Sequence, residues 1–259
     1  MTDTPLSPSP SPSQPPPPAR SPLSTLTLQH RIPASWAADP WAEVRPLIDG
    51  ADVLGEAHPA GLAPSCRNWR GPAGSWPLAV SDEPRRIMIT EPDCTAGCCG
   101  ALYVTVRREV DVVIWDAWEN TGNTGSLPAV MRFEAAQYEA ELARAAADRS
   151  WEEPLDTAAR LLEEILVESR WFERWGCVLI GVWPRRGEPD VPEELTSPEG
   201  VDVMFHDAHA NAHESGGRGT SYGYELLVTG GEPVEEQVRR CAERILADDP
   251  RNTAEIREA

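Results

Sequence analysis

The segment of the sequence best suited to chemistry holds three cysteines, Cys94, Cys98 and Cys99, bracketed by Gly97 and Gly100. Zinc takes about four ligands, and cysteine thiolates separated by two to four residues commonly supply half of such a site. Cys94 and Cys98 have that spacing, whereas Cys99 follows Cys98 directly and no second cysteine pair occurs in the chain. The sequence therefore predicts a tight turn packed with small side chains. Zinc binding by the three thiols, and a redox pair at Cys98 and Cys99, are the alternatives.

Three of the five histidines, His206, His209 and His213, form a second cluster. Imidazoles close to an aspartate such as Asp207 can bind zinc and other divalent metals. On a helix the three rings would share one face, but the segment follows a predicted strand and continues into a glycine-rich run. We therefore expect a solvated loop, with a metal site as the alternative. The sequence predicts no bound cofactor. Zinc, at either of these clusters, is the alternative.

All 23 basic residues are arginines. A chain without lysine cannot form a Schiff base or supply the phosphate-binding lysine of a P-loop. Pyridoxal enzymes, lysine-type aldolases, Walker ATPases and ordinary protein kinases are therefore excluded. The sequence also contains no nucleophile-elbow serine, and the Gly217–Gly223 run has the wrong spacing for a dinucleotide fingerprint.

The chain is strongly acidic, with 42 Asp and Glu and a net charge of −19. Residues 131–259 hold 28 of these acids and 14 arginines, a net charge of −14. A field of this sign repels phosphate backbones and anionic lipid surfaces, so we expect neither a nucleic-acid nor a membrane partner. No apolar run approaches the roughly 20 residues of a membrane span, and no secretory signal is recognised. Sparse cysteines favour reduced thiols and a cytoplasmic location.

Nine of the 26 prolines lie in residues 1–22, which predicts a disordered, partly polyproline II tail over residues 1–30. Ordered sequence is expected to begin near Ile32, with short helical turns that end at Gly50. Alternating apolar and polar residues then predict strands, the second and third forming an antiparallel hairpin. The expected strands are Arg86–Thr90, Ala101–Arg107, Asp111–Trp115, Cys177–Trp183, Val201–His206 and Tyr222–Thr229.

Apolar residues at helical spacing predict three main helices: Glu134–Arg149, one that begins at Pro154, and Pro233–Ala247. Runs of neighbouring strands favour an α+β fold, with a mainly antiparallel sheet of about six strands and the three helices packed to one side. We expect one α+β domain over residues 31–259. Two apposed halves, residues 31–150 and 151–259, are the alternative organisation.

Tryptophan is over-represented, with ten Trp against three Phe. Trp115 and Trp118 flank a strand end, and Trp171, Trp175 and Trp183 lie around a helix end. Packing in the core and at its rim is the favoured interpretation, and a groove lined by these rings is the alternative.

The stretch from Cys94 to Arg108, with the pattern Cys-Thr-Ala-Gly-Cys-Cys-Gly-Ala-Leu-Tyr-Val-Thr-Val, resembles a family of uncharacterised proteins from GC-rich filamentous bacteria. The resemblance extends over nearly everything after the tail, and it implies no activity or ligand. The favoured interpretation of this acidic chain is a non-catalytic protein-binding or regulatory module. The alternative function is a metal- or thiol-dependent site at Cys94, Cys98 and Cys99.

Overall fold

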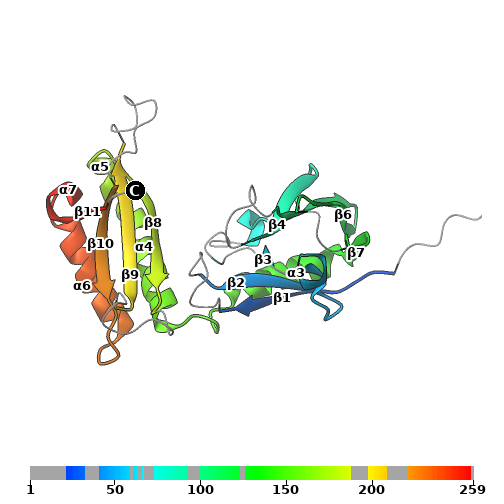
Figure 1. Ribbon diagram of the computed structural model, residues 1–259, viewed down its shortest axis with the longest axis horizontal. Helices are drawn as coiled ribbons and strands as arrows, with labels where there is room; N and C mark the ends of the chain where they lie inside the picture. Colours follow the sequence, from blue (N-terminus) through cyan, green and yellow to red (C-terminus); the bar gives the residue numbers. More distant parts are fainter. Residues whose placement is uncertain are drawn as a thin grey trace, which may run out of the picture.

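The chain folds into two lobes that lie side by side (Figure 1). The computed structural model describes residues 22–32, 41–58, 61–63, 66, 73–92, 100–122, 126–187, 198–208 and 221–257. The first lobe runs from β1 to α3 and the second from α4 to β11, joined by residues 148–153. No helix among these described residues is both long and apolar enough to cross a membrane.

The first lobe contains a two-stranded ribbon, a five-stranded antiparallel sheet and one long helix. The ribbon pairs β1 with β2, and the sheet has the order β3-β4-β5-β6-β7. The elements are β1 (Leu26–Arg31), β2 (Glu43–Ile48), α1 (Val53–Ala57), β3 (Gly61–Leu62), a 3₁₀ turn (Ala73–Ser75), β4 (Arg85–Pro92), β5 (Leu102–Glu109), β6 (Val112–Asn120), β7 (Met131–Glu134) and α3 (Ala135–Ala147).

Strand β5 shows why this sheet forms where the sequence predicts it. Leu102, Val104 and Val106 are buried on one face, and the residues between them are half-buried on the other. That period of two is the signature of a strand with one face on the core. The hairpin to β6 turns at Val110, which has a φ of 54°.

Side chains of helix α3 form hydrogen bonds with the outer edge of the β1–β2 ribbon. Gln137 accepts from the backbone N–H of Leu26 at 3.3 Å and donates to its carbonyl at 2.8 Å. One turn later Glu141 accepts from the N–H of Leu28 at 2.6 Å, and Arg144 donates to the Leu28 carbonyl at 2.7 Å. Because an unpaired strand edge leaves backbone groups without partners, these contacts fix β1 on the helix.

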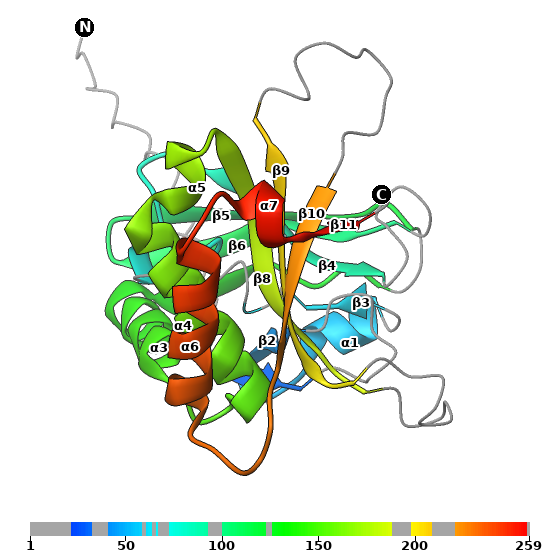
Figure 2. The ribbon, with the colours of Figure 1, turned by 90° about the vertical axis from the view of Figure 1, so that its left-hand side faces the viewer.

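The second lobe is a four-stranded antiparallel sheet of order β11-β10-β9-β8 with helices on one face. Helices α4 and α6 lie next to each other on that face (Figure 2). The elements are α4 (Pro154–Ser169), α5 (Trp171–Arg174), β8 (Cys177–Arg185), β9 (Gly200–Asp207), β10 (Ser221–Leu227), α6 (Val234–Leu246), α7 (Pro250–Thr253) and β11 (Glu255–Arg257). Phe205 is the centre of its core, in ring contact with Phe172, Tyr222 and Tyr224.

The α+β class with antiparallel sheets is confirmed, and all six expected strands and three expected helices are present. The strands are divided among three sheets, and the main helices are divided between the lobes. Two expectations near the N-terminus are wrong. Ordered chain begins before Ile32, because Leu26–Arg31 forms β1, and the expected helical turns up to Gly50 include a strand, β2.

Candidate binding cleft

The predicted metal-site residues fall mostly outside the described residues. Cys94, Cys98 and Cys99 lie outside them, as do His209 and His213. His206 is the next-to-last residue of β9, opposite Ser221 of β10 and Val178 of β8. The neighbouring Asp207 carboxylate accepts from Arg251 at 3.0 Å. No group of three or more His, Cys, Asp or Glu among the described residues is arranged to hold a metal ion. His206 is thus the only predicted ligand among the described residues, and both metal sites remain predictions from the sequence.

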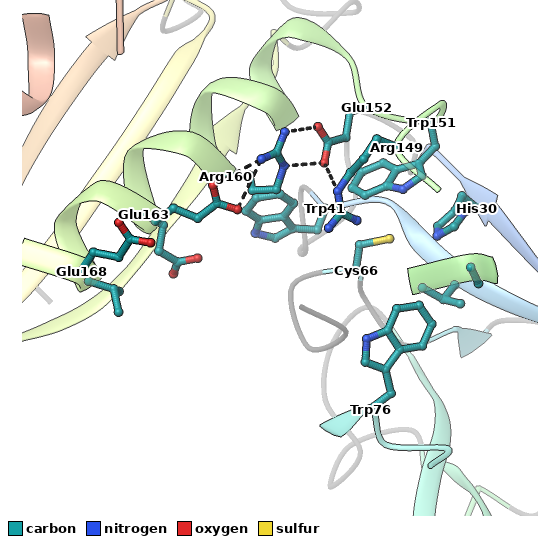
Figure 3. A pocket seen from close by; sticks show the side chains of 14 residues that line it. His30, Trp41, Cys66, Trp76, Arg149, Trp151, Glu152, Arg160, Glu163 and Glu168 are labelled. Atoms are coloured by element: carbon teal, nitrogen blue, oxygen red, sulfur yellow. Dashed lines mark hydrogen bonds and ion pairs between the residues drawn. The ribbon is translucent and has the colours of Figure 1, made fainter. Parts of the chain in front are cut away.

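A cleft of about 340 Å³ between the two lobes is the candidate functional site (Figure 3). It falls within the usual range of ligand pockets, about 300 to 1,000 Å³, at the small end. The first lobe and the linker supply mostly apolar and aromatic groups: His30, Trp41, Val44, Cys66, Trp76, Ala145, Arg149, Trp151 and Glu152. Helix α4 supplies Arg160, Glu163, Glu164, Val167 and Glu168.

Two buried tryptophans, Trp41 and Trp76, form the deep part of the first-lobe wall, each only 2% exposed. Trp41 lies two residues before β2, beside Ala42, whose carbonyl accepts from the N–H of Cys66 at 2.6 Å. Trp76 follows the 3₁₀ turn, and its N–H donates to the Ala73 carbonyl at 3.1 Å. Backbone contacts thus hold the segments that carry these rings.

Helix α4 presents its second face to the cleft. Leu162 and Leu166 are buried in the core of the second lobe, whereas Arg160, Glu164 and Val167 lie on the opposite side of the helix, three and four residues apart. Val167 is 59% exposed, the one apolar side chain on a charged surface. The helix carries an apolar contact point at the mouth of the cleft.

The start of α4 is fixed by a buried ion pair. Asp156 is completely buried and accepts from Nη2 of Arg186 at 2.7 and 2.8 Å, from the end of β8. It also accepts from the N–H of Glu153 at 3.1 Å, as in a capping box. Burial raises the pKa of the Asp156 carboxyl, and Arg186 opposes that rise. These contacts fix the start of α4 on the sheet of the second lobe.

Glu152 holds the two arginines that line the cleft. Its Oε1 and Oε2 accept from Nε and Nη2 of Arg160 at 2.7 and 2.9 Å, and Arg149 Nε lies 3.4 Å from Oε1. The Glu152 side chain is only 4% exposed. Its hydrogen bonds raise the pKa of Arg160, and Glu164 adds an ion pair one turn along α4 at 3.3 Å. Both guanidinium groups therefore have carboxylate partners within the protein.

Two tryptophans connect the lobes. Trp41, although it belongs to the first lobe by sequence, packs within the hydrophobic core of the second. Trp151, in the linker, packs against both cores. His30, at the end of β1, stacks on Trp151 with 5.3 Å between ring centroids. The lobes are thus held together by the same rings that line the cleft.

The cleft is equipped for binding. Its aromatic walls offer contact area, and its α4 side offers carboxylates. Of the described lining residues, Cys66 alone carries a thiol or hydroxyl, and it is buried. Burial also raises the pKa of the Cys177 and Cys241 thiols elsewhere, which lowers their reactivity.

Sequence reasoning did not find this site. Of the tryptophans considered for a groove, Trp115 and Trp171 are buried in the two cores, as the packing interpretation predicts. The cleft uses Trp41, Trp76 and Trp151 instead. The excess of tryptophan was the available signal, but only the meeting of the two lobes selects which rings form a wall. Comparison with protein-family models, curated proteins and solved structures finds no match to this chain.

Proposed function

We propose that this protein is a non-catalytic protein-binding module and that the inter-lobe cleft receives a segment of a partner protein. The observation that carries the proposal is an aromatic-walled cleft with solvent-exposed Val167 at its mouth. Apolar side chains in a concave site, surrounded by charged groups, are the usual anatomy of an interaction surface.

The charged groups of the cleft support binding over catalysis. Glu152 is held by Arg160 and Arg149, so it is poorly placed to exchange a proton with a substrate. Cys66 is buried beneath the aromatic wall. The remaining carboxylates, on α4, lie at a partly exposed helix surface where they interact with a partner by charge.

The same proposal places this chain in the cytoplasm and takes its partner to be a protein. Cys177 and Cys241 are thiols and form no disulfide, which suits a reducing compartment. The net charge of −19 opposes contact with nucleic acids and anionic membranes. A protein surface that carries basic groups is the macromolecular surface that this charge attracts.

Two matched valine substitutions test the proposal. Val167→Arg places a long cation at the mouth of the cleft, and Val130→Arg makes the same change in the first lobe at a site of nearly equal exposure, 57%. Tagged protein is used to capture partners from lysate of the source cells, with quantitative comparison of the three forms. We expect one stoichiometric partner with wild type and Val130→Arg, and its loss with Val167→Arg. Equal recovery by all three forms, or no stoichiometric partner, would rule the proposal out.

A further inference from the structure

We infer that the cleft selects a basic segment, with an arginine or lysine side chain placed between the indole ring of Trp151 and the carboxylates of α4. The inference rests on the proposed function and names the chemistry of the partner. It depends on the formal charge of the lining, on the aromatic wall and on the way the two resident arginines are held.

The lining of the cleft carries a net negative charge. Arg149 and Arg160 face four carboxylates, so the formal charge is −2 with His30 neutral. The four acids are Glu152, Glu163, Glu164 and Glu168. The surrounding lobe adds to the field, since residues 131–259 carry a net charge of −14. A bound cation therefore enters a site of opposite charge.

The aromatic wall suits the same occupant. Figure 3 shows the carboxylates of Glu163 and Glu168 on one side of the cleft and the indole of Trp151, which is half-buried, on the other. The face of an indole ring is the negative part of its quadrupole and attracts guanidinium and ammonium groups. A long basic side chain also has an apolar stem, which covers ring surface while its head reaches the carboxylates.

The resident arginines do not make the cleft a site for an anion. Arg160 is bound by both oxygens of Glu152, and Arg149 by one of them. An anionic ligand of Arg160 would have to compete with Glu152, which is only 4% exposed, and with Glu164. Displacing one partner of a buried ion pair leaves a charge without compensation, which is costly. The field of Glu163 and Glu168 opposes such a ligand as well.

The probes are three acetylated, amidated tripeptides: leucyl-arginyl-leucine, leucyl-citrullyl-leucine and leucyl-glutamyl-leucine. Citrulline keeps the shape of arginine and removes its charge, so the first two peptides isolate the cation. Binding is measured by calorimetry with the full chain. We expect the arginine peptide to bind about tenfold more tightly than the citrulline peptide. We expect the glutamate peptide to bind more weakly than both, and the arginine affinity to fall with added salt.

Paired substitutions locate the effect. Glu163→Gln with Glu168→Gln removes two of the three carboxylate charges on the α4 side of the cleft, and we expect about a tenfold loss of affinity for the arginine peptide. Glu235→Gln, at an exposed position on α6 outside the cleft, is the control and should keep wild-type affinity. Equal affinity for the arginine and citrulline peptides, tighter binding of the glutamate peptide, or no peptide binding overturns the inference. A partner lost only with Val167→Arg would still support the proposed function.

Discussion

His30 stacks on Trp151, with 18° between the ring planes and its Nδ1 3.8 Å from Oδ2 of Asp148. The contact joins the last residues of β1 to the linker between the lobes. Burial lowers the pKa of His30 from its usual 6.5, although Asp148 raises it; Arg144 and Arg149 lower it further, and Glu141 raises it. A titratable ring therefore lies where the two lobes meet.

The stability of the protein should fall as the pH drops below about 6.5. His30 has a lower pKa in the folded state than in the unfolded chain, so the unfolded state binds more protons in that range. The loss begins near the unfolded pKa of 6.5 and is complete below the folded pKa. His58 adds to it, because burial and then Arg45 lower its pKa as well. His30→Phe keeps a ring on Trp151 and removes the titration, and denaturant unfolding across pH 5 to 8 should show a shallower dependence. An unchanged profile would show that His30 does not contribute.

Glu152→Gln should lower the free energy of unfolding by about 2 kcal/mol, because it removes charged hydrogen bonds from a nearly buried site. The substitution should also lower the affinity of the cleft for any ligand, because Arg149 and Arg160 lose the carboxylate that binds both of them. Glu173→Gln is the matched control: Glu173 binds Arg170 with one carboxylate oxygen, on the open surface. Exposed pairs contribute little, so this variant should unfold like wild type. Equal losses in the two variants would contradict the importance given to Glu152.

Val110→Gly should stabilise the protein by about 1 kcal/mol. Val110 has a φ of 54° at the β5–β6 turn, a conformation that a β-branched residue adopts at a cost, and its side chain is 84% exposed. Little packing is lost when it is removed. Val130→Gly, at an exposed valine without a positive φ, should be neutral or destabilising. The melting temperatures of both variants test this prediction. A melting temperature for Val110→Gly below that of wild type would contradict it.

Deleting residues 2–28 should destabilise the protein by about 4 kcal/mol or more, because Leu26 and Leu28 are buried in the first core. The deletion also leaves Gln137 and Glu141 of α3 without their backbone partners. Deleting residues 2–21 is the control, and its proline-rich composition predicts unchanged unfolding. Equal melting temperatures for the two truncated proteins would contradict this account of β1.

The elements that depend on local pattern could be predicted, and those that depend on pairing could not. The alternation in β5 and the helical stripe of α4 are visible in the sequence because each buries one face. Strand β2 was missed because nearly all of it is buried and Pro46 interrupts it. Proline is tolerated there because β2 belongs to a two-stranded ribbon, at the edge of a sheet.

The cleft lay beyond sequence reasoning for the same physical reason. Glu163 and Glu164 have the pattern of a solvated helix face, and nothing local distinguishes them from Glu235 and Glu236 of α6. Their position becomes special only because α4 crosses opposite Trp41. That arrangement follows from tertiary contacts such as the packing of Trp41 in the core of the second lobe.

The cysteine turn remains a prediction from the sequence, with Cys94, Cys98 and Cys99 outside the described residues. We expect elemental analysis of the purified protein to find no stoichiometric zinc, and a chelator to leave its melting temperature unchanged. If the three thiols hold zinc, the protein should contain about one equivalent, and a chelator should destabilise it strongly, because metal binding is coupled to folding. One equivalent of zinc would establish the alternative function.

Photo-crosslinking tests the central claim most directly. A benzophenone-bearing amino acid is placed at position 167 in one protein and at position 130 in another, at valines of nearly equal exposure. Each protein is irradiated in lysate of the source cells, and the crosslinked peptides are sequenced by mass spectrometry. The account predicts one partner protein, crosslinked at position 167 and not at position 130, through a single segment. Crosslinks of equal yield at both positions, or the absence of a defined partner segment at position 167, would contradict it.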